Sequence, residues 1–157
     1  MIAQSSAGKS AADSKFAMNA AQGGMMEVEL GKVAVKNASS DKVKQFGQRM
    51  IDDHSKAGDE LKSVASKENI TLPTELDAKH KAMVDKMSAM SGTAFDRAYM
   101  NDMVKDHQQD VAEFQKEANS GSNADLKAFA GKTLPTLQEH LKLAQDTNAS
   151  LSSTSRK

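Results

Sequence analysis

The chain of 157 residues contains no cysteine and no tryptophan, and only two prolines and one tyrosine. Without cysteine there are no disulfides, no thiolate zinc sites and no cysteine nucleophiles. No apolar run is long enough to span a membrane, and the first residues lack the apolar segment of a signal peptide. The formal net charge is zero, so nothing indicates a nucleic-acid or anionic-membrane partner. A Gly-rich phosphate loop and a nucleophile elbow are also missing.

Helix-forming residues dominate what remains. Alanine, lysine, glutamate, methionine and leucine favour helix, whereas the 4% aromatic content argues against a large sheet. The length suits one domain with its own core. We therefore predict an all-α domain over residues 13–149. Residues 1–12 and 150–157 are rich in serine and have no periodicity, so they are predicted to be disordered.

Hydrophobic periodicity and capping residues divide the domain into four long helices. The predicted helices are residues 13–38, 40–68, 93–119 and 123–149. Ser40 suits the N-cap of the second helix, and Pro73 ends the connection that follows it. Thr93 with Asp96 resembles a capping box for the third helix. Pro135 lies inside the fourth helix, where we expect a kink or a break.

The lengths of the connections indicate how the helices are arranged. The first and third connections are short, which forces antiparallel neighbours. The second covers residues 69–92 and carries leucine and methionine at helical spacing, which predicts a short extra helix. A connection of this length allows a crossover, so we predict a ferritin-like four-helix bundle of two antiparallel hairpins. An up-down-up-down bundle, in which the short helix covers one end, is the alternative.

Each long helix has an apolar stripe that one strongly polar residue interrupts near its middle. These residues are Glu27, His54, His107 and His140. Glu27 lies about 13 residues before the first turn and His54 about 14 after it, so at 1.5 Å per residue they share a level. His107 lies about 14 residues before the last turn and His140 about 18 after it, roughly one helical turn further. His140 therefore either joins the other three or belongs to a separate layer.

Buried polar side chains need partners, and a carboxylate with three imidazoles is a competent ligand set for zinc, iron, manganese or copper. We predict a mononuclear metal site of Glu27, His54, His107 and His140 inside the bundle. The first alternative is a metal-free bundle in which a buried His–Glu hydrogen-bond network sets register or senses pH. The second is a Cu(I) site of methionine and histidine, although the ten methionines are also ordinary core filler.

A carboxylate immediately precedes three of these residues, at Asp53, Asp106 and Glu139. Adjacent residues point about 100° apart on a helix, so these carboxylates do not share the metal-facing side. A solvated flank is the favoured interpretation, and a hydrogen bond to an imidazole of another helix is the alternative. Asp110 lies one turn from His107 and could contribute to the site.

Glycines at positions 23, 24 and 31 lie inside the first predicted helix. Glycine there is less favourable than alanine by about 1 kcal/mol. We expect these glycines to permit a close approach between helices.

Several segments resemble the family of exported bacterial proteins called "domain of unknown function 4142". They are Gly24 to Gly31, Phe46 to His54, Phe95 to Tyr99, His107, and Leu134 to His140. The resemblance implies a ferritin-like bundle in the periplasm or cell envelope and no established activity. It also implies that the family's Glu and His positions fall on the four residues named above.

One departure from other ferritin-like proteins bears on the chemistry. Dinuclear carboxylate ferritins carry Glu-x-x-His on two helices. Here Ile51 and Leu137 stand three residues before His54 and His140. Iron oxidation at a di-iron centre and iron storage are therefore not expected. The favoured role is metal binding or stress protection rather than catalysis.

Overall fold

The computed structural model describes residues 10–154, and five α-helices account for most of them. The helices are α1 (Ala11–Asn37), α2 (Asp41–Lys67), α3 (Ala78–Ser88), α4 (Gly92–Ser120) and α5 (Ala124–Thr154). Within the described residues the only β-type pairing is an isolated bridge between Ala38 and Gly92. The predicted all-α class is confirmed.

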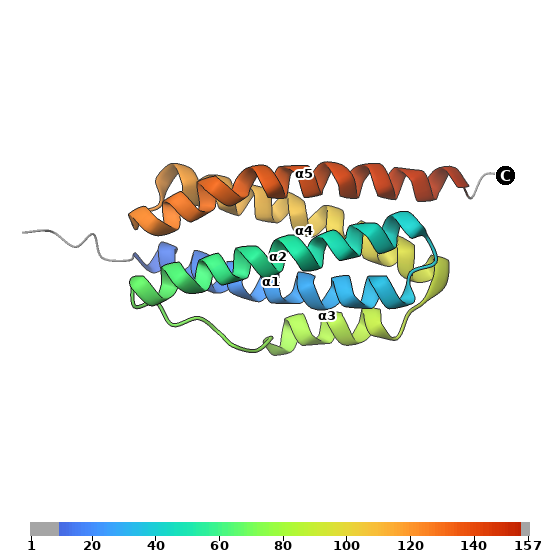
Figure 1. Ribbon diagram of the computed structural model, residues 1–157, viewed down its shortest axis with the longest axis horizontal. Helices are drawn as coiled ribbons and strands as arrows, with labels where there is room; N and C mark the ends of the chain where they lie inside the picture. The colour runs from blue at the N-terminus through green and yellow to red at the C-terminus, as the bar shows by residue number, and fades with distance from the viewer. Residues whose placement is uncertain (1–9, 155–157) are drawn as a thin grey trace, which may run out of the picture.

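The helices form two antiparallel hairpins that pack against each other (Figure 1). One hairpin is α1 with α2, and the other is α4 with α5. The connection after α2 carries the chain back along the bundle, and α3 packs there against α1 (Figure 1). As a result α4 begins beside the α1–α2 turn, where Ala38 pairs with Gly92. An up-down-up-down order would start α4 at the opposite end, so the crossover arrangement is the one observed.

A buried aspartate of α4 fixes the α1–α2 turn. Asp96 accepts hydrogen bonds from the Ser39 backbone N–H at 3.1 Å, the Ser39 hydroxyl at 2.8 Å and the Ser40 N–H at 3.0 Å. Ser40 is the N-cap of α2, but its own side chain makes no capping bond. The predicted Thr93–Asp96 capping box is wrong, because α4 begins at Gly92 and Asp96 caps the neighbouring hairpin instead.

At the opposite end of the bundle, a buried aspartate of α1 fixes the α4–α5 turn in the same way. Asp13 of α1 forms a capping box with Ser10 and also accepts hydrogen bonds from the N–H groups of Ser122 at 3.1 Å and Asn123 at 3.0 Å. The Asn123 side chain in turn accepts from the Leu126 N–H at 3.0 Å at the start of α5. Each hairpin turn is thus held by a carboxylate from the first helix of the other hairpin.

The helices extend further than the sequence predicts. α1 begins at Ala11 because the Ser10 capping box starts it there, and α5 continues to Thr154. Residues 11–12 and 150–154 are therefore helical rather than disordered, and Leu151 packs against the core. Ser10 of the predicted N-terminal tail caps α1, and residues 1–9 and 155–157 lie outside the described residues. α5 is also continuous through Pro135, so no break occurs there.

The apolar core has two parts, and the layer of polar residues lies between them along every long helix. The part nearer the α1–α2 turn includes Leu30, Met50, Phe95, Tyr99 and Met103. The part nearer the α4–α5 turn includes Phe16, Leu61, Phe114, Leu126 and Phe129. The methionines of α3 pack against the first part, which is the role of core filler.

Candidate metal centre

The four polar residues predicted from the stripes come together between the two parts of the core. Glu27 comes from α1, His54 from α2, His107 from α4 and His140 from α5. Their exposed fractions are 1%, 8%, 0% and 0%. The imidazole centroids lie 5.2 to 5.8 Å apart, and one nitrogen of each ring lies within 4.8 Å of the others.

Hydrogen bonds on the outer side of two rings fix which nitrogen faces the centre. Nδ1 of His107 donates to the carbonyl oxygen of Met103 at 2.8 Å, because a carbonyl can only accept. Nε2 of His140 donates to Oδ2 of Asp53 at 2.6 Å. In the neutral forms of both rings, the remaining nitrogens carry lone pairs, as in a ligating histidine. These nitrogens are Nε2 of His107 and Nδ1 of His140, and both are buried.

Four buried atoms face one another without making hydrogen bonds. They are Oε2 of Glu27, Nε2 of His54, Nε2 of His107 and Nδ1 of His140. The Glu27 oxygen contacts Nε2 of His54 and lies 3.6 Å from Nε2 of His107. Neither contact has hydrogen-bond geometry, although Glu27 and His54 lie close enough for an ion pair. An unsatisfied buried polar group costs about 1–3 kcal/mol. The ligand atoms of two overlapping triads, His54 with His107 and His140, and Glu27 with His107 and Asp110, each lie close enough together to hold a metal ion.

The pKa shifts at the centre favour an ionised Glu27 and a neutral His140. Burial would raise the pKa of Glu27, but His107 and His54 hold that pKa well below its usual range. Burial would lower the pKa of His54, but the Glu27 charge raises it. Burial, together with the positive charge of neighbouring imidazoles, lowers the pKa of His140 to about 4. Near neutral pH, Glu27 is ionised and His140 is uncharged.

Asp53 orients His140, which corrects its interpretation as a solvated flank. It bonds the His140 ring and also accepts a hydrogen bond from Nε of Arg49 at 3.1 Å. Burial would raise the pKa of Asp53, but these two bonds lower it, so the group is ionised. Glu139 is the solvated flank that the sequence predicts: it is exposed and pairs with Arg49 at 2.9 Å.

Further carboxylates on α4 surround Glu27. An oxygen of Asp110 lies within 4.8 Å of ligand atoms of Glu27 and His107. Burial, followed by the Glu27 charge and a hydrogen bond to it, raises the pKa of Asp110 well above its usual value. Asp106 is half-buried, and burial and the charge of Asp102 raise its pKa to about 7. Burial and the neighbouring Glu27 charge therefore favour the protonated form of Asp110.

The direction of helical side chains explains how His140 reaches the centre. It lies about four residues, roughly 6 Å, further from the α4–α5 turn than His107 does. Side chains on a helix lean toward its N-terminus. In an antiparallel hairpin His107 therefore leans away from the turn and His140 toward it, so the two rings approach each other. The ring of His140 therefore lies 5.2 Å from that of His54 and 5.3 Å from that of His107, in the same layer as these two.

Fold and centre together define an all-α helical bundle with a buried His and Glu cluster. The chain belongs to the family described as "Domain of unknown function (DUF4142)", whose profile matches residues 2–147. Among solved structures it is similar to the crystal structure of a DUF305 fragment from Deinococcus radiodurans, with 11% sequence identity and a TM-score of 0.77. That match covers 90% of this chain and 98% of the other, and it supports the fold alone. No curated protein matches the chain. Among the described helices, none has the length and apolar character that crossing a membrane requires.

Proposed function

We propose that this chain is a ferritin-like metal-binding protein whose mononuclear site is formed by Glu27, His54, His107 and His140. One observation carries the proposal: one nitrogen of each imidazole lies within 4.8 Å of the other two, Glu27 contacts two of these rings, and all four residues are buried with an atom that lacks a hydrogen-bond partner. The crossover between the two hairpins supports the ferritin-like part of the proposal. A donor set of nitrogen and carboxylate oxygen suits zinc, iron, manganese or copper.

The proposed role is binding or stress protection rather than catalysis. Structural zinc sites use four protein ligands, whereas catalytic sites keep a position open. Four protein ligands converge here, which favours holding a metal. The absence of Glu-x-x-His pairs in this chain, with Ile51 and Leu137 at the relevant positions, argues against a di-iron centre.

The test is metal analysis of protein purified without a histidine tag. Wild type is expected to retain or take up one divalent ion per chain, and the His54→Ala/His107→Ala variant none. His80→Ala is a matched control, because His80 lies on α3 and pairs with Asp77 away from the centre. Equal and negligible metal in wild type and the double variant would sink the proposal.

A metal-free His–Glu network is the second candidate, and the contact between His54 and Glu27 favours it. Each residue shifts the pKa of the other toward its charged form, as expected of an ion pair. This candidate predicts a melting temperature that does not change when EDTA is added. A large decrease with EDTA would exclude it.

Cu(I) binding by methionine and histidine is a weaker candidate, because the α3 methionines pack into the core. Competition with a Cu(I) chelator tests it.

We also propose an exported, periplasmic location, for which the support is the family resemblance of the sequence. Fractionation of cells that express the natural gene from its own start tests this location. Recovery of the protein only with cytoplasmic markers would contradict it.

A further inference from the structure

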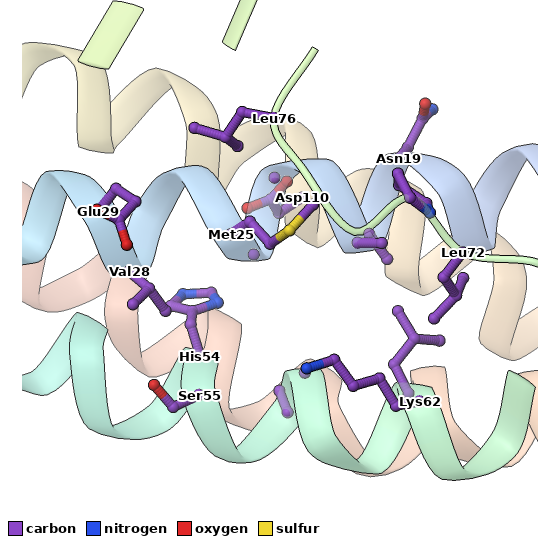
Figure 2. A pocket seen from close by; sticks show the side chains of 18 of the residues that line it. Asn19, Met25, Val28, Glu29, His54, Ser55, Lys62, Leu72, Leu76 and Asp110 are labelled. Carbon is purple, nitrogen blue, oxygen red and sulfur yellow. The ribbon is translucent and has the colours of Figure 1, made fainter. Parts of the chain in front are cut away.

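A cavity of about 690 Å³ lies between α1, α2 and the connection that follows α2 (Figure 2). This volume falls in the range of small-molecule pockets. Much of the wall is apolar, from Met25, Val28, Leu72, Leu76, Phe114 and Phe129. His54 of the candidate metal centre and Asp110 beside it also line the cavity.

Three glycines keep this space open. Gly23, Gly24 and Gly58 all lie inside helices and line the cavity, and a Cβ at any of them would meet nothing within 4 Å. At Gly31, in contrast, a Cβ would lie 2.6 Å from the carbonyl oxygen of Gly47. Close helix approach therefore explains Gly31, as expected, but that expectation is wrong for Gly23 and Gly24. Since glycine disfavours helix, its use at open positions points to a need for the space.

Two of these glycines are tied to the centre by helical spacing. Gly24 lies three residues before Glu27, and Gly58 lies four residues after His54. Residues at these spacings share a helix face. The open volume therefore begins one turn from two of the proposed metal ligands.

The connection over the cavity is fixed to α1 by Gln22. The Gln22 amide donates to the carbonyl oxygen of Glu75 at 3.0 Å and accepts from the Asp77 N–H at 3.0 Å. In Figure 2 this connection passes in front of the cavity near Leu72 and Leu76. These two hydrogen bonds therefore fix the connection between α2 and α3 where it covers the cavity.

The charges around the cavity limit what it can bind. Its wall carries both signs, from Glu29, Asp59, Lys62, Glu75, Lys81, Asp85 and Asp110. Acidic residues outnumber lysines on this wall, so an anionic ligand would meet net repulsion. A cationic group would face the proposed metal ion. An uncharged polar group avoids both repulsions.

We propose that this cavity binds a small, uncharged and mainly apolar molecule, whose polar group lies against His54 and Asp110. The placement of that molecule beside a metal rests on the proposed function, whereas the cavity itself does not.

Titration with N-phenyl-1-naphthylamine, an uncharged apolar fluorophore, tests the proposal. Its matched anionic analogue is 1-anilinonaphthalene-8-sulfonate. We expect saturable binding of the uncharged dye, and at least about tenfold weaker binding of the sulfonate. Gly24→Leu and Gly58→Leu should each weaken binding of the uncharged dye by about tenfold or more, because leucine fills the open space. Gly131→Leu is the control, since Gly131 is an exposed glycine inside α5 that does not line the cavity.

Absence of saturable binding, equal binding by the filled variants, or equally tight binding of the sulfonate would overturn the proposal. Circular dichroism confirms that the variants fold, and Gly24→Ala replaces either leucine variant that does not.

Titrations with EDTA-treated and Co(II)-loaded protein separate the two proposals. Failure to form a Co(II) spectrum contradicts the metal site, while dye binding still tests the cavity. A Co(II) spectrum that does not respond to bound dye contradicts the placement beside His54.

Discussion

Carboxylates are buried both at the ends of the bundle and in its middle, but their contacts differ. At the ends, Asp13 and Asp96 accept hydrogen bonds from backbone N–H groups of the opposite hairpin's turn. In the middle, Oε2 of Glu27 lies against the nitrogens of two imidazoles, and the carboxylate also bonds Asp110. The end carboxylates bond the backbone of a turn, whereas the central one contacts only other titratable side chains.

This difference separates polar groups that hold the fold from those that are available for a ligand. A carboxylate bonded to several N–H groups is satisfied and fixes the chain. A cluster of unpaired lone pairs in an apolar core is unfavourable unless a cation completes it. The ends should therefore determine stability, and the middle should determine metal affinity.

Asp96→Ala should have the largest effect and act on stability. It removes three hydrogen bonds to the α1–α2 turn and leaves N–H groups without their carboxylate. We expect a loss of about 3–5 kcal/mol in the free energy of unfolding, measured by urea denaturation. The folded fraction should keep the metal stoichiometry of wild type. A loss below about 0.5 kcal/mol would contradict the role given to the bundle ends.

Glu27→Gln should act mainly on metal affinity. The substitution keeps the shape of the side chain but removes the anionic ligand. We expect affinity to fall about 100-fold, which corresponds to about 2.7 kcal/mol, in competition with a chromogenic chelator. Wild-type affinity in this variant would show that Glu27 is not a ligand.

Asp53→Asn should have a smaller effect on the same property. The carboxylate that orients His140 is lost, but every proposed ligand remains. Loss of such a partner weakens metal binding by about 10-fold to 100-fold, and we expect the lower figure because Asp53 is partly exposed. Asp52→Asn is a suitable control, since Asp52 is exposed and bonds only Gln48 in the described structure. Equal affinities of the two variants would contradict the role of Asp53.

Glu117→Gln should have the smallest effect, and that effect should depend on pH. Burial, with a hydrogen bond to Asp13, raises the pKa of Glu117 from 4.5 to about 7. The folded state then binds more protons than the unfolded state between these values, so stability falls as pH rises through this window. Glutamine imitates the protonated acid. The melting temperature should rise relative to wild type at about pH 8 and change little at about pH 5. A gain of equal size at both values would contradict the shifted pKa.

Most of the fold follows from patterns within single helices, and so do the four central residues. Glu27, His54, His107 and His140 stand out because they interrupt otherwise apolar stripes. The tail residues 150–154 were harder to predict, because their helix depends on Leu151 packing against the core. Spacing within a helix says little about such distant contacts.

Interactions between hairpins explain the other differences from the sequence predictions. The sequence pattern pairs Asp96 with the nearby Thr93. In the structure, however, Asp96 bonds the α1–α2 turn, more than 50 residues earlier in the chain. Asp53 is a flank of its own helix but reaches α5. The glycines were ambiguous because close packing at Gly31 and open space at Gly24 have the same sequence signal.

The most direct test of the central claim is the X-ray absorption spectrum of the metal in untagged, metal-loaded protein. The account predicts one ion per chain, bound by three imidazoles and one carboxylate at about 2.0–2.2 Å, with no sulfur ligand. The imidazole scattering should decrease in His107→Ala. A sulfur shell would contradict the proposed ligand set in favour of methionine, and a metal bound only by water and carboxylates would contradict it altogether.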